Sequence, residues 1–482
     1  MVRRRRENSE KRSTKQGRIQ GAAEPNKIGA STPFDFTAKQ LTPYGGLLPV
    51  ATMLEKLGFE QLVQETLTIA RVPRVMSVYQ FVLAMVLGLY IGFARLHQLR
   101  FVARDPIVTG ILHVTQLPPQ STLWRFLDSL LQHVAHQILR LQATLRQRVW
   151  AASHVRLTTV TVDTDTTVHT IYGDKMGARK SYNPKNKGKK SYQPILTFLA
   201  ETREYLWGEL HNGDRPTGTQ IAAHLRGVFS ALPAGVTHRQ ARADSGFYCW
   251  DAVEAYERAD CRFVVVARKT APLVARLTQA KWTPSPDTDA DEQCEFLYQP
   301  AGWPRPYRFV ALRYEAPPGE PTASAVEQYQ LFATATYTYR VFVTTFTDPI
   351  APVVWFYNRR AGAENLIKEA NNDAGLMAHP SHRFDVNGNH LQLAMLAYNL
   401  NCWLLLFQRD DTTTDATTMR HTTLATARLK FLFVAAKIWR HAGRVGVSYS
   451  ADYAEQAVLQ RLMDRLRRMT GAFAPVIRLA VT

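Results

Sequence analysis

Four acidic residues in three separate segments have the chemistry to hold a divalent metal ion. In "TVDTDTT" (161–167), Asp163 and Asp165 alternate onto one face of a predicted strand. In "RADSGFY" (242–248), Asp244 ends another predicted strand, and Gly246 then allows a tight turn. Glu364 lies on a later predicted helix. Carboxylate oxygens suit Mg²⁺ or Mn²⁺, and two such ions about 4 Å apart can catalyse phosphodiester exchange. Each aspartate alone could equally be a turn or cap residue.

The segment around Glu364 predicts one amphipathic helix with a polar line beside its apolar stripe. In "FYNRRAGAENLIKEANND" (356–373), five polar residues fall within roughly 80° of one another at 100° per residue. These are Tyr357, Arg360, Glu364, Lys368 and Asn371. By itself this pattern also fits a surface helix with an Arg360–Glu364 pair, which contributes little stability.

A basic segment follows the Asp165 strand and could contact DNA. Between residues 174 and 194, cations alternate with Tyr182 and Tyr192. Tyrosines can stack on bases or sugars while cations contact phosphates. A solvated mobile loop is the alternative. The lysines that we predict to bind DNA are Lys180, Lys185, Lys187, Lys189 and Lys190.

The overall charge favours a polyanionic partner, nucleic acid before a membrane. The 482 residues carry a formal charge of +19.

The four cysteines form no CxxC pair and no zinc spacing, which fits a reducing cytosol. The basic start lacks the apolar region of a secretory signal. The apolar run 78–94 is long enough to span a bilayer, but we interpret it as a buried core helix because Gln80, Gly88 and Gly92 interrupt it.

The order of elements predicts an α/β protein with a ribonuclease-H-like catalytic core. From about residue 155 the patterns run β-β-β-α-β-α-β, which is the order of that fold. A strand-rich stretch then separates this run from the helix that carries Glu364, and we interpret it as an inserted β-subdomain. Helical regions flank the core, and a plain helical bundle is as good an interpretation of the N-terminal one as a helix-turn-helix domain. The predicted regions are a disordered basic tail (1–38), a helical DNA-binding domain (39–152), the catalytic core (153–270 and 348–408), the inserted β-subdomain (271–347) and a helical C-terminal region (409–482).

These motifs resemble the DDE transposases of bacterial insertion sequences, specifically the group with a β-insertion and a Tyr-Arg-Glu-Lys signature helix. The D-x-G-x-Y motif occurs as Asp244, Gly246 and Tyr248, and Y-x-x-R-x-x-x-E occurs as Tyr357, Arg360 and Glu364. The resemblance covers about residues 40–480. It implies a metal triad of Asp165, Asp244 and Glu364, with Asp163 as the alternative to Asp165.

The resemblance also implies a DNA-contacting role for the rest of the signature helix. Tyr357 and Arg360 would contact phosphates at the end of the element. The family's lysine would fall at position 371, where this chain has Asn371, and Lys368 lies one turn earlier on nearly the same face. We expect the asparagine at this position to affect either one contact with DNA or the activity of this copy of the transposase.

The implied function is cut-and-paste DNA transposition. Metal-activated water would cut at the element's ends, and the freed 3′-OH would attack target DNA, in relatives by way of a hairpin. The implied partners are double-stranded DNA (terminal inverted repeats and target) and a second copy of the chain, with no membrane. The implied location is the bacterial cytoplasm, at the nucleoid when DNA is bound. Two alternatives stay open: a metal-dependent DNA nuclease on the same fold, and a catalytically decayed DNA-binding derivative.

Overall fold

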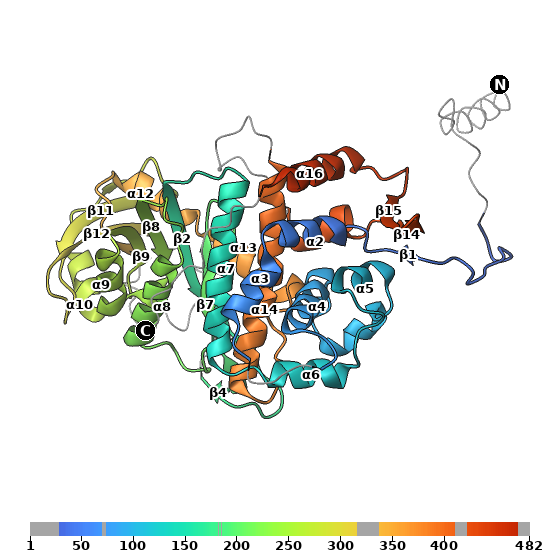
Figure 1. The fold of residues 1–482 in the computed structure, drawn as a ribbon. Helices are drawn as coiled ribbons and strands as arrows, with labels where there is room; N and C mark the ends of the chain where they lie inside the picture. Colours follow the sequence, from blue (N-terminus) through green and yellow to red (C-terminus); the bar gives the residue numbers. More distant parts are fainter. Residues whose placement is uncertain are drawn as a thin grey trace, which may run out of the picture. The chain divides into compact units, whose positions relative to one another are not determined.

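The computed structural model describes residues 28–69, 74–181, 183–184, 186–315, 337–409 and 422–470. The chain forms two units, Met1–Lys39 and Gln40–Thr482. In the first unit, the described residues 28–39 are exposed and form no helix or strand. The second unit contains the elements that follow (Figure 1).

A nine-stranded mixed sheet organises the second unit, in the order β10-β11-β12-β13-β9-β8-β2-β6-β7. Strands β2, β8 and β9 run parallel, and β6 and β7 run antiparallel to their neighbours. The five-strand part β7-β6-β2-β8-β9 is consistent with the predicted ribonuclease-H-like core. Its strands are β2 (Thr159–Thr166), β6 (Ile195–Leu199), β7 (Tyr205–Glu209), β8 (His238–Ala243) and β9 (Cys261–Val266).

Helices cover both faces of this core. The first face contacts α8, where the hydroxyl of Thr197 bonds both Thr164 on β2 (2.9 Å) and His224 (2.8 Å). The second face carries Asp163, beside which Arg242 donates to the carbonyl of Phe356. Because side chains alternate along β2, Asp165 also belongs to the second face. The helices are α8 (Gly218–Ser230) and α9 (Trp250–Arg258) on the first face, and α12 (Ile350–Asn358) and α13 (Ala361–Asp373) on the second.

The stretch predicted as an inserted β-subdomain is rich in strands, but these strands continue the core sheet. Strand β13 pairs antiparallel with β9, with Phe342 opposite Val266. The run 341–344 is buried and apolar or hydroxylic, so it covers an edge of β9 that would otherwise leave backbone groups unpaired. A helix precedes the strands. The elements are α10 (Ala271–Thr278), β10 (Thr283–Pro284), β11 (Glu292–Tyr298), β12 (Tyr307–Glu315) and β13 (Tyr337–Thr344).

The described part of the N-terminal region is mostly helical. The apolar helix α4 begins at a Ser77 capping box and ends at Gly92, whose φ of 116° suits a glycine. Its residues from Phe81 to Ile91 are buried, which confirms the predicted core helix. Helix α7 packs against α3 and α14. The helices are α2 (Leu47–Lys56), α3 (Phe59–Thr66), α4 (Val78–Ile91), η1 (Leu96–Val102), α5 (Pro106–Leu112), α6 (Gln120–Asp128) and α7 (His133–Ala152).

Within the described ranges, no single helix has both the length and the apolar composition to cross a membrane. Helices α4 and η1 pass that test together, but a bend of 86° separates them.

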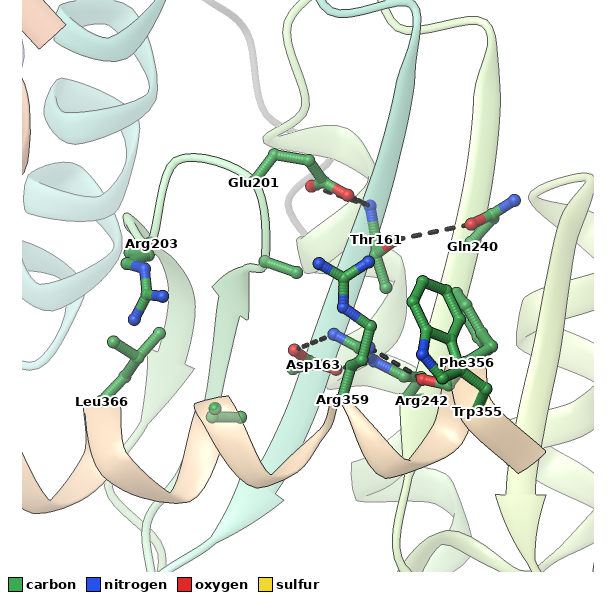
Figure 2. A pocket seen from close by; sticks show the side chains of 13 residues that line it. Thr161, Asp163, Glu201, Arg203, Gln240, Arg242, Trp355, Phe356, Arg359 and Leu366 are labelled. Carbon is green, nitrogen blue, oxygen red and sulfur yellow. Dashed lines mark hydrogen bonds and ion pairs between the residues drawn. The ribbon is translucent and has the colours of Figure 1, made fainter. Parts of the chain in front are cut away.

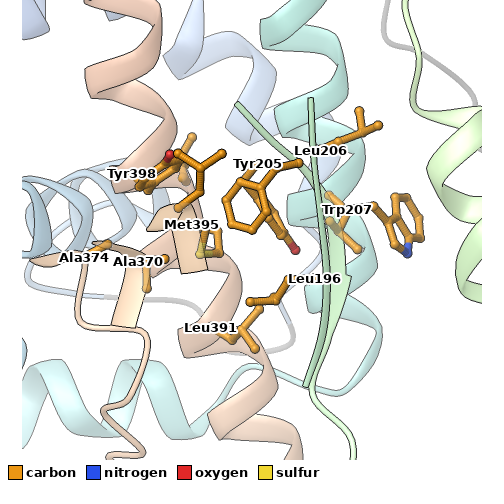
Figure 3. Close-up of a cluster of buried hydrophobic side chains, with 14 of the residues drawn as sticks. Leu196, Tyr205, Leu206, Trp207, Ala370, Ala374, Leu391, Met395 and Tyr398 are labelled. Carbon is orange, nitrogen blue, oxygen red and sulfur yellow. The ribbon is translucent and has the colours of Figure 1, made fainter. Parts of the chain in front are cut away.

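The long helix α14 (Phe384–Gln408) joins the N-terminal helices to the sheet. It contacts α4, α7, α16 and β7. Figure 3 shows its residues Leu391, Met395 and Tyr398 packed between Leu196 and Tyr205 of the sheet and the small side chains of α13. Since α14 is buried nearly all round, its apolar composition reflects a central helix inside the core.

The C-terminal region, predicted to be helical, contains a β-hairpin within its described part. Strands β14 and β15 pair around a turn with positive φ at Ala442 and Gly443, and β14 also pairs with β1 near the start of the unit. The alternating "KIWRHAGRVGVSY" and its Ala-Gly turn favour a hairpin, so the helical prediction was wrong here. The elements are β1 (Leu41–Thr42), α15 (Leu424–Ala427), the π-helix η4 (Arg428–Leu432), β14 (Ala436–His441), β15 (Arg444–Tyr449) and α16 (Gln456–Arg468).

Candidate metal and DNA site

The sheet register brings two of the predicted carboxylates to neighbouring positions. On the parallel strands β2 and β8, Thr164 pairs with Ala243. Asp165 and Asp244 follow these residues, so they occupy the next corresponding positions, where neighbouring strands lie about 4.8 Å apart. The Asp244 carboxylate also accepts the backbone N–H of Gly246 (2.9 Å) and thereby fixes the turn that ends β8. Two carboxylates therefore meet at one edge of the core.

The predicted single helix around Glu364 is interrupted by one tight turn. Helix α12 ends at Asn358 and α13 begins at Ala361. Between them, the N–H of Arg360 bonds the carbonyl of Tyr357 (2.8 Å), and the N–H of Ala363 bonds that of Arg360 (2.8 Å). These i→i−3 bonds tighten the helix without reversing it, because Arg359 and Arg360 keep right-handed helical angles. Arg360 thus sits at the start of α13, one turn before Glu364.

The guanidinium of Arg360 lies between two of the predicted metal ligands. Its Nη2 is 2.7 Å from Asp165 Oδ2, and its Nη1 is 3.4 Å from Glu364 Oε1. Burial raises the pKa of Asp165 to about 7; the Arg360 charge opposes that rise and the Asp244 carboxylate adds to it. Burial also opposes the charge on Arg360, but the surrounding carboxylates outweigh it and raise the pKa of Arg360. Arg360 therefore remains a cation among acidic groups.

Asp163, the alternative ligand, is engaged in a different ion pair. Arg242 on β8 donates two hydrogen bonds to it, Nε to Oδ1 at 2.6 Å and Nη2 to Oδ2 at 2.7 Å. Both side chains are buried. Figure 2 shows this pair in the wall of a cavity of about 320 Å³, with Glu201 and Arg359 also in the lining. A carboxylate with both oxygens bound to a buried guanidinium is a poor metal ligand, which favours Asp165 over Asp163.

The acidic residues are of the types that bind a hard divalent cation, but in this structure the proposed ligands do not surround one common point. Carboxylate oxygens are the donors that Mg²⁺ and Mn²⁺ prefer. Throughout the part of the chain that the structure describes, no three His, Cys, Asp or Glu side chains converge closely enough to hold an ion. The Glu364 side chain is 66% exposed and points its charge to Arg360.

Tyr357 is a core residue in this structure. Its ring lies 4.8 Å from that of Phe342, with the Arg340 guanidinium 5.2 Å from its ring centre. Burial raises the pKa of its hydroxyl. Its predicted phosphate contact stays a prediction, and Lys368 on the same helix line is exposed.

Asn371, which stands at the position of the family's lysine, belongs to a polar chain with two histidines. Its Nδ2 donates to Thr167 Oγ1 (3.3 Å), so its Oδ1 accepts from His169 Nε2 (2.9 Å). His169 Nδ1 then accepts from His379 Nε2 (3.1 Å). Burial lowers the pKa of His169 to about 4 and that of His379 to about 2, so both rings are neutral. Asn371 therefore ties α13 to the segment that follows β2.

The basic segment forms a small sheet where the sequence suggested a loop. Strands β3 (His169–Thr170), β5 (Lys190–Tyr192) and β4 (Arg179–Lys180) lie side by side. Lys180, Lys187 and Lys189 are exposed. Lys190 pairs with Asp174 (3.1 Å), while Lys185 lies outside the described residues. Lys175 anchors the segment by donating to the carbonyls of His379 and Ser381 (2.8 and 2.9 Å).

A cavity of about 410 Å³, the Trp124 cavity, lies where this segment meets the N-terminal helices. Trp124 and Tyr172 are exposed in its lining at 40% and 72%. Arg95 and Lys175 add positive charge, and none of the described lining residues is acidic. Aromatic and basic side chains without acidic ones suit a nucleic acid strand.

Sequence reasoning missed Arg242, which pairs with Asp163, and the two histidines that connect to Asn371. Arg242 stands two residues before Asp244, so strand alternation alone would have placed both on one face. No comparable signal links His169 or His379 to Asn371, because they meet only in the folded chain.

A comparison with known proteins identifies the sequence family of this chain. A family model described as "Transposase DDE domain group 1" matches residues 26–471. No curated protein matches the chain. A cryo-EM structure of the piggyBac transposase synaptic complex with hairpin DNA is similar to this chain, with a sequence identity of 9% and a TM-score of 0.39. The match covers 90% of this chain and 86% of the chain in that structure. That structural likeness is weak, and the family match stands without it.

Proposed function

Since the chain belongs to the family of transposase DDE domains and is therefore a DNA transposase, we propose that it moves an insertion sequence by cut-and-paste transposition. Hydrolysis at the element's ends would free 3′-hydroxyls, and these would attack target DNA. Asp165, Asp244 and Glu364 would be the catalytic residues and the ligands of Mg²⁺ or Mn²⁺. The observation that carries the proposal is the register of β2 and β8, which puts Asp165 beside Asp244.

The proposed triad draws each carboxylate from a separate element. Asp165 lies on β2, Asp244 directly follows the neighbouring strand β8, and Glu364 comes from the helix that crosses these strands. When bound, a divalent metal supplies positive charge that stabilises the attacking and leaving oxygens of the scissile phosphate. The two aspartates hold fixed positions in the sheet, whereas the exposed Glu364 has freedom to move toward them.

The DNA would lie over the basic segment and the Trp124 cavity. The exposed Lys180, Lys187, Lys189 and Lys368 supply phosphate contacts, whose number sets the salt dependence of binding. The Trp124 cavity adds aromatic surface from α6, which supports a DNA-binding role for the N-terminal helices. Two element ends must be held together, so we propose a homodimer on DNA, in a bacterial cytoplasm.

The test is cleavage by the purified protein of duplex DNA that carries the element's own ends, with Mg²⁺ or Mn²⁺. We expect cleavage at the ends, and its loss in Asp165→Ala, Asp244→Ala and Glu364→Ala. Glu201→Gln is a matched control, because Glu201 is an acidic residue near Asp163 that accepts the backbone N–H of Thr161. That variant should still cleave.

The products separate the proposal from its two alternatives. Joining of the cut end to a target plasmid supports transposition, whereas cleavage without joining indicates a nuclease on the same fold. Specific binding without cleavage indicates a decayed derivative. Cleavage that survives in Asp165→Ala but not in Asp163→Asn would assign the ligand to Asp163.

A further inference from the structure

Two arginines neutralise the four carboxylates of the candidate site, but they divide these carboxylates unequally. Four carboxylates, Asp163, Asp165, Asp244 and Glu364, share Arg242 and Arg360. Arg242 is committed to Asp163 through two short hydrogen bonds. Arg360 is left to face the three proposed metal ligands. It occupies space among the carboxylates that a metal ion would need.

The contact between Arg360 and Asp165 is close but poorly directed. Although Nη2 lies 2.7 Å from Asp165 Oδ2, neither Nη2 nor Nε of Arg360 makes a well-aligned hydrogen bond to any described group. Both atoms are buried. A guanidinium presents its donors in a fixed fork that a phosphate can satisfy with two parallel bonds. Arg360 therefore has buried donors that a phosphate would pair better than Asp165 does.

One of the two partners of Arg360 is exposed to solvent. Arg360 itself lies in the tight turn between α12 and α13, and its side chain is only 7% exposed. Its second partner, Glu364, is largely exposed. A small rotation could thus carry the guanidinium from the carboxylates toward a ligand arriving from solvent.

We propose that Arg360 is an exchangeable counter-ion that couples metal binding to DNA binding. In the DNA-free protein, its charge neutralises Asp165 and Glu364 and disfavours a divalent cation there. A DNA phosphate draws the guanidinium away and leaves the three carboxylates to the metal. By linkage, DNA then raises metal affinity by the same factor by which metal raises DNA affinity. This inference rests on the proposed triad.

The test measures Mn²⁺ affinity by calorimetry in the absence of DNA. Arg360→Gln should bind Mn²⁺ about tenfold more tightly than the wild type, because a fixed positive charge has left the carboxylates. Arg360→Lys keeps the charge and should stay close to the wild type. Arg359→Gln is the matched control, since Arg359 is the exposed neighbour stacked on Trp355, and its affinity should not change.

A second measurement uses a short duplex of the element's end as the probe. Adding it should raise the Mn²⁺ affinity of the wild type and change that of Arg360→Gln much less. Circular dichroism checks that each variant is folded. Unchanged or weaker Mn²⁺ binding by folded Arg360→Gln without DNA would overturn the inference.

The outcomes for Arg360 and for the proposed function are distinguishable. Asp165→Asn should remove the Mn²⁺ binding that Arg360→Gln strengthens. If it does and the protein still fails to cleave DNA, the counter-ion inference survives while the transposition proposal fails. If Asp165→Asn leaves Mn²⁺ binding intact, the ion binds elsewhere and Arg360 has no such role.

Discussion

Two buried arginines in this protein each pair with a carboxylate, but the surroundings of the two pairs differ. Arg146 on α7 pairs with Glu204 just before β7, at 3.2 Å, and both side chains are fully buried. Arg360 pairs with Asp165 at 2.7 Å, but its other partner, Glu364, is 66% exposed. The first cluster is closed to solvent and the second is open to it.

The closed cluster satisfies its carboxylate from several helices. Trp150 of α7 donates to Glu204 Oε2 (2.8 Å), and Trp403 of α14 donates to Oε1 (2.6 Å). Arg146 Nη2 also donates to the carbonyl of Tyr205 (2.6 Å). These bonds connect the N-terminal helices, α14 and the sheet. A buried carboxylate whose two oxygens both accept hydrogen bonds holds its neighbours in one arrangement, although Nε and Nη1 of Arg146 make no aligned hydrogen bond to any described group.

The open cluster lacks these supporting donors. The charge of Arg360 is matched by several acidic groups, and two of its donors are unaligned, as are two donors of Arg146, so the two clusters differ in their carboxylates rather than in their arginines. The comparison teaches that burial of an arginine does not define its role. The hydrogen bonds that its carboxylate partner accepts and the exposure of its partners distinguish a pair that holds the fold from one that can exchange for a ligand.

The largest stability effect should come from breaking the closed cluster. Glu204→Gln leaves Arg146 buried without a counter-charge, so we expect the free energy of unfolding to fall by roughly 3–5 kcal/mol. Urea unfolding measures it. Glu364→Gln is the matched control and should change stability by less than about 1 kcal/mol, because Glu364 is largely exposed. Equal losses in the two variants would contradict the distinction between closed and open clusters.

A smaller effect should follow from removing Arg360. Arg360→Gln should lower the free energy of unfolding by about 1–2 kcal/mol, less than a closed pair would, because solvent reaches Glu364 and Asp165 can take up a proton near pH 7. The same urea titration measures it. A loss as large as that of Glu204→Gln would show that Arg360 is a structural residue.

Acid should lower the free energy of unfolding through buried histidines that lie outside the closed cluster. Burial lowers the pKa of His169 and His390 to about 4 and of His224 to about 3. An unfolded histidine titrates near 6.5, so the stabilisation is complete above that pH and is lost as pH falls toward 4. Each histidine contributes a slope of up to about 1.4 kcal/mol per pH unit.

Urea unfolding at several pH values tests this. His224→Gln should flatten the slope between pH 6 and pH 5, because one proton fewer is taken up on unfolding. His238→Gln replaces an exposed histidine and should leave the slope unchanged. A slope that is the same in the wild type and in His224→Gln would contradict a neutral His224 in the folded protein.

The smallest effect concerns position 371. Asn371→Lys restores the residue type of the family motif but removes the bonds to His169 and Thr167, so stability should fall by about 1 kcal/mol. Its DNA binding should depend more steeply on salt, because one phosphate contact is added. Fluorescence anisotropy at several salt concentrations measures it. An unchanged salt slope would mean that position 371 does not reach DNA.

The sequence predicted the local elements of the core because their signals are local. Alternating β-branched residues marked β2, and the run "TGTQIAAHLRGVFSAL" marked α8. The acidic residues were found because Asp165 and Asp244 stand near strand ends in the order that the core requires. The hairpin at residues 436–449 was not predicted, although its residues alternate as those of strands do.

By itself, then, the sequence determined the main elements of the core, their order and the acidic residues of the candidate site, but not the C-terminal hairpin. Only the tertiary structure decided which cation faces which carboxylate. Asp163 and Arg242 are 79 residues apart, and their pairing depends on the register between β2 and β8. Arg360 reaches Asp165 only because α13 crosses the same face of the sheet. Charge pairing depends on distances of a few ångströms between distant segments, and no local pattern encodes those distances.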